Sequence, residues 1–332
     1  MHKIEVIGHR GARSYFPENT IPAYDFAIKS GVDMIDLDVV ATKDKVLICY
    51  HDLIINPDIL CDISGNYLAK SKKEFIKHLL ITNTIDNYLI KNLTLQELQN
   101  SYRVKLNSNS PYASYFPKQK DIPGIKISSL QDIVDYVNHM TSSTMPLQVE
   151  IKNNLDNYDY SYSFSELAVL LYDFILKNNL IERIKIQAFD WRILLELNKL
   201  EPKIKTAYLV DYTFKSNWQR WFANSNIIIK AYEFIKNKGQ QLNIYNLDDF
   251  NVNDKILYLI KYLGAYSYEP EDNELTKNQV DLSHDLSIKV YVWTWPEHSG
   301  FVTRIEVIQR LSNWGIDGFI TDDPIMVKNL LD

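Results

Sequence analysis

Short runs rich in β-branched and aromatic residues alternate with helical patterns along most of this 332-residue chain. Such alternation is typical of parallel strands joined by crossover helices. At this length it favours a (β/α)8 barrel, in which eight strands close into a ring. The chain offers nine runs for eight places, so one run is either no strand or a strand outside the barrel. The nine runs are IEVIGH, MIDLDVV, VLICYH, PLQVEIK, RIKIQAF, KTAYLV, GAYSYE, IKVYVW and DGFIT.

The second and third runs do not fit the parallel pattern. Asp38 and His51 are 13 positions apart, with the turn-like sequence TKDK between the two apolar runs. A parallel crossover needs about a dozen residues or more for the connection alone. No helix fits between these two runs.

After Asp52 the alternation of strands and helices lapses until about Lys126. This stretch is polar and rich in Asn, Lys and Ser, and its clearest helical pattern is the weak one in LTLQELQNSY. We interpret residues 52–126 as an insertion on the barrel rim after the third strand, within a single domain that spans residues 1–332.

Two of the helical patterns have recognisable ends. In ENTIPAYDFAIKSG, Asn19 or Thr20 is a candidate N-cap and Gly31 is a candidate left-handed stop. In SSLQDIVDYVNHM, Ser128 or Ser129 can cap a helix that carries an apolar stripe. Both segments are therefore predicted to be crossover helices.

Composition limits the expected partners. The chain has 36 basic and 42 acidic residues, a formal net charge of −6, so no basic surplus points to nucleic acid or to an anionic membrane. No apolar run approaches the roughly 18 residues that a membrane span needs, and we expect no stable membrane insertion. A small soluble substrate is the expected partner, while the sequence leaves the oligomeric state open.

The N-terminal sequence and the cysteine content favour a cytoplasmic protein. MHKIEVIGHRG has Glu5 and His9 where a secretory signal needs an unbroken apolar core. Two cysteines are too few for a disulfide framework and fit a reducing compartment. A periplasmic or secreted protein whose signal had been removed would have the same sequence, so that alternative stays open.

The run MIDLDVV places two acids in a segment that is otherwise typical of a buried strand. Side chains two positions apart on a strand project from the same face, so Asp36 and Asp38 are predicted to lie side by side. Two unpaired charges in a core are costly. The acids therefore need a shared cation, or they form salt bridges, or the segment is an edge strand or no buried strand at all.

Other polar residues also fall at strand ends, which converge on one mouth of a (β/α)8 barrel, where active sites are built. Three carboxylates there suit Mg²⁺ or Ca²⁺, two histidines suit acid and base roles, and two basic side chains suit an anion. This set points to metal-assisted phosphoryl chemistry. Its members are His9, Arg10, Asp36, Asp38, His51, Glu150 and Lys152.

Each member also has a structural explanation when taken alone. The sequence HRG at a strand end can be a turn in which Gly11 supplies an unusual backbone angle and His9 is merely hydrogen-bonded. An EIK sequence alternates as in any half-exposed strand. Only the coincidence of all these residues at one barrel mouth favours a functional site.

An ordered series of motifs resembles the glycerophosphodiester phosphodiesterase family. The series is GHRGARSYFPENTIPAYDFAIKSGVDMIDLDVVATKDKVLICYHD, then EIK, QAFDW, VYVWTW and DGFITDDP. The resemblance implies a TIM barrel that uses a divalent cation, Ca²⁺ or Mg²⁺, to hydrolyse glycerophosphodiesters to glycerol 3-phosphate and an alcohol. It also implies an insertion after the HD motif, where the alternation lapses here.

The resemblance implies roles for nine residues. The acid and base pair would be His9 and His51, and the phosphate contacts would be Arg10 and Lys152. The metal ligands would be Asp36, Asp38 and Glu150, and apolar walls would come from Phe189 and Trp293. Position 36 departs from the family pattern, which usually has Glu, and the shorter Asp places its carboxylate about 1.5 Å further from a metal positioned for Glu.

The implied mechanism leaves several points open. We favour His51 as the base and His9 as the acid, although the sequence does not fix this order. Two other functions remain: a phospholipase C- or D-like barrel that acts on lipid headgroups and needs an exposed apolar rim in the insertion, or a catalytically silent barrel that binds a phosphorylated ligand. The headgroup and the identity of the metal are also open.

Overall fold

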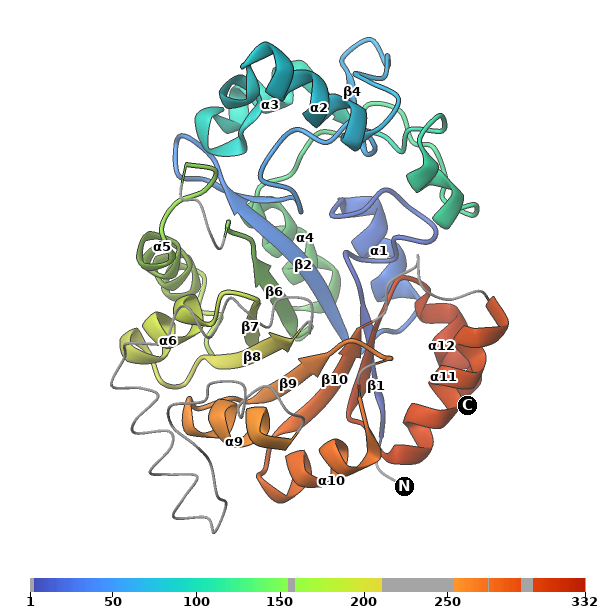
Figure 1. Cartoon of the computed structure of the whole chain (residues 1–332), viewed down its shortest axis with the longest axis vertical. Coiled ribbons are helices and arrows are strands. Elements are labelled where there is room, and N and C mark those ends of the chain that lie inside the picture. The colour runs from blue at the N-terminus through green and yellow to red at the C-terminus, as the bar shows by residue number, and fades with distance from the viewer. Residues whose placement is uncertain (1–2, 155–158, 211–253, 274, 294–300, 332) are drawn as a thin grey trace.

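The computed structural model describes residues 3–154, 159–210, 254–273, 275–293 and 301–331. Within these ranges, eight parallel strands form a closed ring in the order β1-β11-β10-β9-β8-β7-β6-β2, and β1 pairs with β2 to close it. The predicted (β/α)8 barrel is therefore confirmed (Figure 1). The strands are β1 (Glu5–Gly8), β2 (Met34–Ala41), β6 (Leu147–Ile151), β7 (Ile184–Ala188), β8 (Lys205–Val210), β9 (Ser267–Pro270), β10 (Lys289–Trp293) and β11 (Gly318–Thr321).

The ninth run is a strand outside the barrel. Strand β3 (Leu47–Cys49) pairs antiparallel with the end of β2, with Val39 opposite Cys49 and Ala41 opposite Leu47. A tight hairpin needs no crossover helix, which explains why none fits between these runs.

Helices surround the barrel strands (Figure 1). The first predicted crossover helix begins after Thr20, and Gly31 beyond its end has a φ of +74°. In the second, the Ser129 side chain accepts a hydrogen bond from the Asp132 N–H, and the Asp132 carboxylate bonds back to Ser129. The helices are α1 (Ile21–Lys29), α4 (Leu130–Thr141), α5 (Phe164–Lys177), α6 (Trp191–Leu200), α9 (Asp254–Tyr262), α10 (Lys277–Asp285), α11 (Phe301–Trp314) and α12 (Pro324–Leu331).

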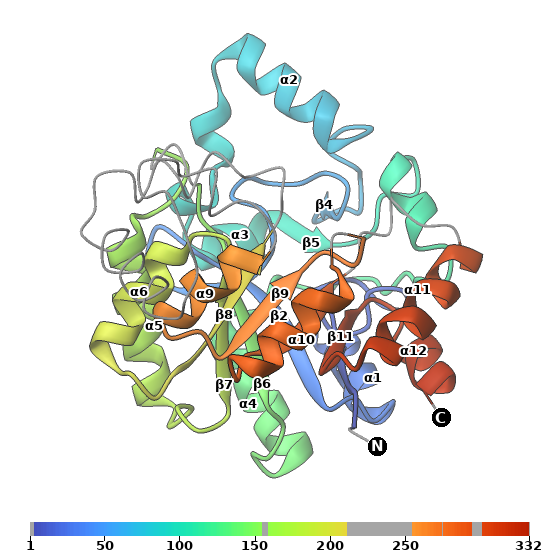
Figure 2. The same cartoon turned by 60° about the horizontal axis from the view of Figure 1, so that its bottom comes forward.

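Residues 52–126 build a separate layer on one end of the barrel and contribute no strand to the barrel sheet. Figure 2 shows α2 as the outermost element of this layer. An apolar cluster that includes Phe75, Leu79 and Leu98 packs this layer against Val40 and Ile48 of the β2–β3 hairpin. The elements are β4 (Leu60–Asp62), α2 (Lys72–Thr82), α3 (Leu95–Ser101), β5 (Tyr102–Val104) and the 3-10 helices η1 (Ile85–Tyr88), η2 (Ile90–Asn92) and η3 (Pro111–Tyr115).

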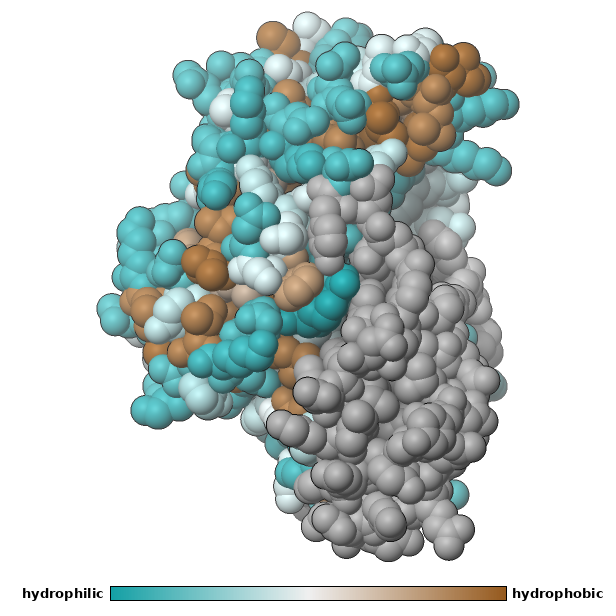
Figure 3. Space-filling model, turned by 60° about the vertical axis from the view of Figure 1, so that its left-hand side comes forward, coloured by the Kyte–Doolittle hydropathy of each residue, from teal (hydrophilic) through white to brown (hydrophobic). Residues whose placement is uncertain are grey.

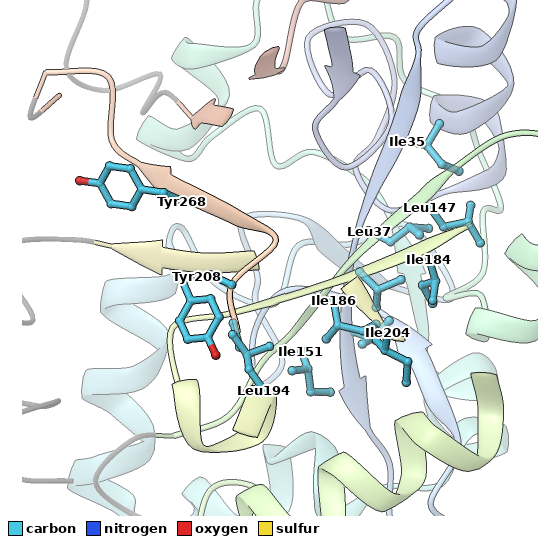
Figure 4. Close-up of a cluster of buried hydrophobic side chains, with 14 of the residues drawn as sticks. Ile35, Leu37, Leu147, Ile151, Ile184, Ile186, Leu194, Ile204, Tyr208 and Tyr268 are labelled. Carbon is cyan, nitrogen blue, oxygen red and sulfur yellow. The ribbon is translucent and has the colours of Figure 1, made fainter. Parts of the chain in front are cut away.

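The two faces of each barrel strand have different surroundings. Ile35 and Leu37 belong to the large apolar cluster of the barrel and its helices, together with side chains of β6 and β7 (Figure 4). The alternate residues Asp36 and Asp38 are fully buried and bond to polar groups of other segments. The alternation of MIDLDVV thus separates an apolar layer from a polar one. No helix in the described part of the chain is long and apolar enough to cross a membrane.

The loop after β1 depends on glycine. Gly11 has a φ of +89°, and a Cβ atom added there would lie 2.7 Å from the carbonyl carbon of Ala23 in α1. The Gly11 N–H donates to the Gly8 carbonyl at 3.1 Å, which closes a tight turn around His9 and Arg10. The turn predicted from HRG is therefore present, and it holds the end of β1 against α1.

Substitution Gly11→Ala should lower the free energy of unfolding by more than about 1 kcal/mol beyond the loss caused by Gly65→Ala. Gly65 has a similar φ of +87° but nothing within 4 Å of an added Cβ, so it isolates the conformational part of the cost. Urea unfolding of both variants measures the difference. Equal losses would contradict the close contact at Gly11.

Candidate active site

A pocket of about 470 Å³, including its open mouth, lies where the barrel strands end. Eight of the nine residues singled out from the sequence line it, although they are separated by up to 284 positions in the chain. The ninth, Asp38, contacts two of the lining residues, Arg10 and Lys152. The eight are His9, Arg10, Asp36, His51, Glu150, Lys152, Phe189 and Trp293.

The first histidine is oriented by a buried acid. Nδ1 of His9 lies 2.7 Å from a carboxylate oxygen of Asp322, directly after β11. Arg13 donates two hydrogen bonds of 2.9 Å to the same carboxylate. Burial lowers the pKa of His9, partly offset by the negative charge of Asp322. A bond at Nδ1 leaves Nε2 of His9 as the atom for proton transfer.

The second histidine is held by its neighbour in the sequence. Nδ1 of His51 lies 3.4 Å from the Asp52 carboxylate. This carboxylate also accepts a hydrogen bond of 2.7 Å from Asn56 and forms an ion pair with Lys72 of α2. Burial and the positive charges of Arg10 and Lys152 lower the pKa of His51 to about 4. His51 is therefore neutral near pH 7, the form that can accept a proton.

Arg10 adopts a strained backbone conformation with a φ of +51°. Its guanidinium lies 2.6 Å from Glu18 and 2.8 Å from Asp38. Glu18 in turn accepts a hydrogen bond of 2.6 Å from the hydroxyl of Tyr112, in the rim layer. The tight turn and these acids fix Arg10 at the pocket wall.

Asp36 is bonded to two glutamines of neighbouring strands. One carboxylate oxygen accepts hydrogen bonds from Gln148 at 3.1 Å and Gln187 at 2.5 Å. The other oxygen, Oδ2, is buried without a hydrogen-bond partner among the described residues. Burial and the nearby charges of Asp38 and Glu150 raise the pKa of Asp36 well above its usual range.

Asp38 and Glu150 share one ammonium group. Lys152 lies 3.2 Å from Oδ1 of Asp38 and also contacts the Glu150 carboxylate. Burial opposes ionisation of Asp38, but Arg10 and Lys152 together hold its pKa well below its usual range. Burial raises the pKa of Glu150 to about 7, despite the opposing charge of Lys152. The salt-bridge alternative for the buried acids is thus realised for Asp38 and Glu150.

The donor set suits a hard divalent cation, although the side chains are not gathered around one. Two carboxylate oxygens, Asp36 Oδ2 and Asp38 Oδ1, are buried without a hydrogen bond, and carboxylate oxygens are the ligands that Mg²⁺ and Ca²⁺ prefer. In the described ranges no three His, Cys, Asp or Glu side chains are close enough to hold a metal as they stand. Binding would therefore require Lys152 to leave Asp38 and Glu150.

One wall of the pocket is apolar. The rings of Phe189 and Trp293 meet edge to face with centroids 6.0 Å apart, and Leu209 and Ile320 complete the wall. The indole N–H of Trp293 donates to the carbonyl of Glu269 at 2.9 Å, which fixes the ring. The pocket thus places charged groups opposite a rigid apolar surface.

Several residues that contact the candidate site residues or their neighbours were not identified from the sequence. Gln148 precedes Glu150 by two positions on the same strand, the same spacing that singled out Asp36, so this signal was available. Asp322 stands in the motif DGFITDDP directly after a strand, which was a weaker signal. Lys72 and Tyr112 gave no signal, because only the path of residues 52–126 brings them to the site.

The comparisons with known proteins agree on one family. The model of the "Glycerophosphoryl diester phosphodiesterase family" matches residues 9–326. A glycerophosphodiester phosphodiesterase of Caldanaerobacter subterraneus is 23% identical over 329 residues, which cover 99% of this chain and 98% of that protein.

Two solved structures have a similar fold. A Silicibacter pomeroyi protein with the provisional name glycerophosphoryl diester phosphodiesterase superposes with a TM-score of 0.77, at 22% identity over 99% of this chain and 93% of its own. A phosphodiesterase of Oleispira antarctica, whose structure contains its product sn-glycerol-3-phosphate, has a TM-score of 0.61 at 16% identity, over 99% of this chain and 96% of its own. At these identities the likeness shows the fold alone.

The lowered pKa of His51 should make stability depend on pH. The pKa of a histidine in an unfolded chain is about 6.5, whereas the pKa of folded His51 is about 4. Between these pH values only the unfolded chain binds the proton. The stability that neutral His51 contributes is complete above about pH 6.5 and is lost as the pH falls. Over this interval the free energy of unfolding of the wild type should fall, relative to that of His51→Gln, by at most about 1.4 kcal/mol for each unit by which the pH is lowered.

Urea unfolding at pH 7 and pH 5, with EDTA present, measures this loss for the wild type and His51→Gln. A difference between the two proteins that does not change with pH would contradict a buried, neutral His51.

Proposed function

The chain belongs to the glycerophosphoryl diester phosphodiesterase family, and we propose that it hydrolyses glycerophosphodiesters to glycerol 3-phosphate and an alcohol. The observation that carries this proposal is the pocket in which His9, His51, Arg10 and Lys152 face an apolar wall. A phosphodiester needs positive charge around its phosphate, a proton acceptor and a proton donor. The two histidines, Arg10 and Lys152 are side chains of the types that could supply all three, and they line one cavity.

Members of this family depend on a divalent cation, and in this chain Asp36, Asp38 and Glu150 would hold it. The ion is Ca²⁺ or Mg²⁺, and when bound it supplies Lewis-acid chemistry that neutralises phosphate charge and lowers the pKa of a glycerol hydroxyl. Two buried carboxylate oxygens support this assignment: Asp36 Oδ2, which accepts no hydrogen bond among the described residues, and Asp38 Oδ1, whose contact is the ion pair with Lys152. Gln148 and Gln187 already hold one oxygen of Asp36, so Asp36 would reach the cation through Oδ2.

The two histidines divide the proton transfers. His51 is neutral near pH 7 and takes the proton of the attacking hydroxyl or water, while His9 protonates the departing alcohol. Asp322, through its contact at Nδ1, opposes the burial that lowers the pKa of His9 and so favours the protonated form that the acid role needs. Arg10 and Lys152 bind the phosphate oxygens from the pocket wall. Phe189 and Trp293 pack against the carbon atoms of the glycerol or of the leaving alcohol.

The wider organisation follows the same proposal. One catalytic domain spans residues 1–332, residues 52–126 are its family-type insertion, and the enzyme works in the cytoplasm on a small diffusible substrate. Two contacts support the role of the insertion, since Lys72 pairs with Asp52 and Tyr112 donates to Glu18. The insertion thus supports groups beside the catalytic pocket.

A second candidate is a phospholipase C- or D-like activity on lipid headgroups. It requires an exposed apolar rim in residues 52–126, and Ile63, Leu80 and Ile81 in this layer are 61%, 60% and 74% exposed. Turnover of vesicle-embedded lipid, with none of the deacylated glycerophosphodiester, would favour this candidate over the first.

Incubation with glycerophosphocholine or glycerophosphoethanolamine and Ca²⁺ or Mg²⁺ should release glycerol 3-phosphate, and EDTA should abolish the release. His9→Ala and His51→Ala should each lower kcat by about 10²- to 10⁴-fold, and their pH profiles should show which limb each histidine controls. A coupled glycerol 3-phosphate assay provides the rates. No release with any cation from folded protein would leave the catalytically silent barrel as the better account.

Substitution Asp36→Glu restores the residue that the family usually has and tests whether the short side chain limits metal binding. If Asp36 reaches the cation only poorly, the longer side chain should tighten metal binding and raise kcat. Isothermal titration with Ca²⁺ and Mg²⁺ measures the first effect independently of activity. Weaker binding would mean that Gln148 and Gln187 have adapted the site to Asp36.

A further inference from the structure

Helix α2 in the rim layer carries an exposed apolar face. Leu80 and Ile81 are 60% and 74% exposed, whereas Phe75 and Leu79 on the other side of the helix are buried in the rim cluster. Large aliphatic side chains at such exposure lose the burial that normally stabilises them. The face therefore points away from the protein and has no described partner.

The same face is basic. With about 3.6 residues per turn, Lys73, Lys77, Leu80 and Ile81 fall within about 100° of one another around the helix. Lys73 and Lys77 are exposed and form no ion pair with any described residue. From residue 70 to residue 83 the sequence KSKKEFIKHLLITN has four lysines and one acid, and the ion pair of Lys72 with Asp52 leaves a local charge of +2 in a chain of net charge −6. Positive charge is thus concentrated where apolar side chains are exposed.

The helix is also accessible. Figure 2 shows α2 at the outer end of the molecule, and Figure 3 shows apolar side chains beside polar ones at the upper end, which residues 52–126 form. No described segment packs over Leu80 and Ile81, which is why they remain largely exposed.

We propose that α2 is a docking surface for an anionic phospholipid bilayer. Lysines beside exposed aliphatic side chains are the arrangement with which a helix lies in a membrane interface, with its charges at the headgroups and its apolar side chains just below them. The exposed lysines Lys73 and Lys77 favour an anionic surface over a neutral one. At 11 residues, α2 is too short to span a bilayer, so the contact is peripheral.

The docking helix is tied to the catalytic end of the barrel. Ser71 caps its start, the Lys72 N–H donates to Asp58 at 3.0 Å, and the Lys72 side chain pairs with Asp52 beside His51. These bonds hold the first turn of α2 to the segment that follows β3. The protein would therefore meet the lipid surface with a fixed orientation, whichever substrate its pocket hydrolyses.

Co-sedimentation with vesicles tests the apolar part of the surface. The wild type should bind vesicles of phosphatidylcholine with 30% phosphatidylglycerol in 0.1 M NaCl, and much less in 0.5 M NaCl or with phosphatidylcholine alone. Leu80→Ser/Ile81→Ser should weaken binding by about tenfold or more. The control Val169→Ser/Leu176→Ser removes two exposed side chains of α5 and should leave binding unchanged.

A second pair of variants tests the charges. Lys73→Glu/Lys77→Glu should weaken binding by about 20-fold or more, since each lysine contributes about fivefold at an anionic surface. Lys177→Glu/Lys203→Glu changes the net charge equally at exposed sites outside α2 and should have little effect. Equal losses in both pairs would overturn the assignment to α2, because general electrostatic attraction would then explain the binding.

A labelled cysteine gives a readout that requires no destabilising change. Ile81→Cys carrying the environment-sensitive dye NBD should brighten on anionic vesicles, and Leu176→Cys carrying NBD should not; the native Cys49 and Cys61 are buried. No brightening at position 81, or no vesicle binding by the wild type, would overturn the proposal. Concentration-dependent dimerisation that Leu80→Ser/Ile81→Ser abolishes would assign the face to a second copy and overturn it as well. These measurements need no hydrolysis, so they stand apart from the proposed activity.

Discussion

The fully buried charge of Asp38 is the constraint around which the catalytic end of this barrel is organised. A carboxylate with no access to water is costly unless cations compensate it, and Arg10 and Lys152 do so here. Arg10 reaches this place only because the turn after β1 adopts left-handed backbone angles. Lys152 pairs with Glu150 as well, so one ammonium serves two strands. The same groups that make the buried acid tolerable are those that would bind a phosphodiester.

The charges of the buried carboxylates also bear on how this pocket would bind a cation. With Lys152 between Asp38 and Glu150, the carboxylates are compensated by the protein itself. Asp36 has different surroundings: two glutamines donate to one of its oxygens, and its pKa is raised well above the usual range. A divalent ion would therefore compete with an ammonium group for two of its ligands and with a proton for the third. Cation affinity in this chain depends on that competition as much as on ligand geometry.

Two short chains of contacts join the rim layer to residues of the pocket. Lys72 at the start of α2 pairs with Asp52, which contacts His51, and Tyr112 in η3 bonds to Glu18, which holds Arg10. The overall charge of −6 gave no reason to expect an anionic partner, but net charge does not describe local distribution. Helix α2 carries two exposed lysines, Lys73 and Lys77, that form no ion pair with any described residue.

The sequence by itself determined the barrel, the strand ends that carry the chemistry and the side-by-side placement of Asp36 and Asp38. These follow from local rules, because alternation has a fixed period on a strand and parallel strands end at a common mouth. Only the tertiary structure decided what each acid contacts: Lys152 between Asp38 and Glu150, and glutamines beside Asp36. It also placed β3 outside the barrel. Such pairings join segments far apart in the chain, and no local pattern encodes the distances between them.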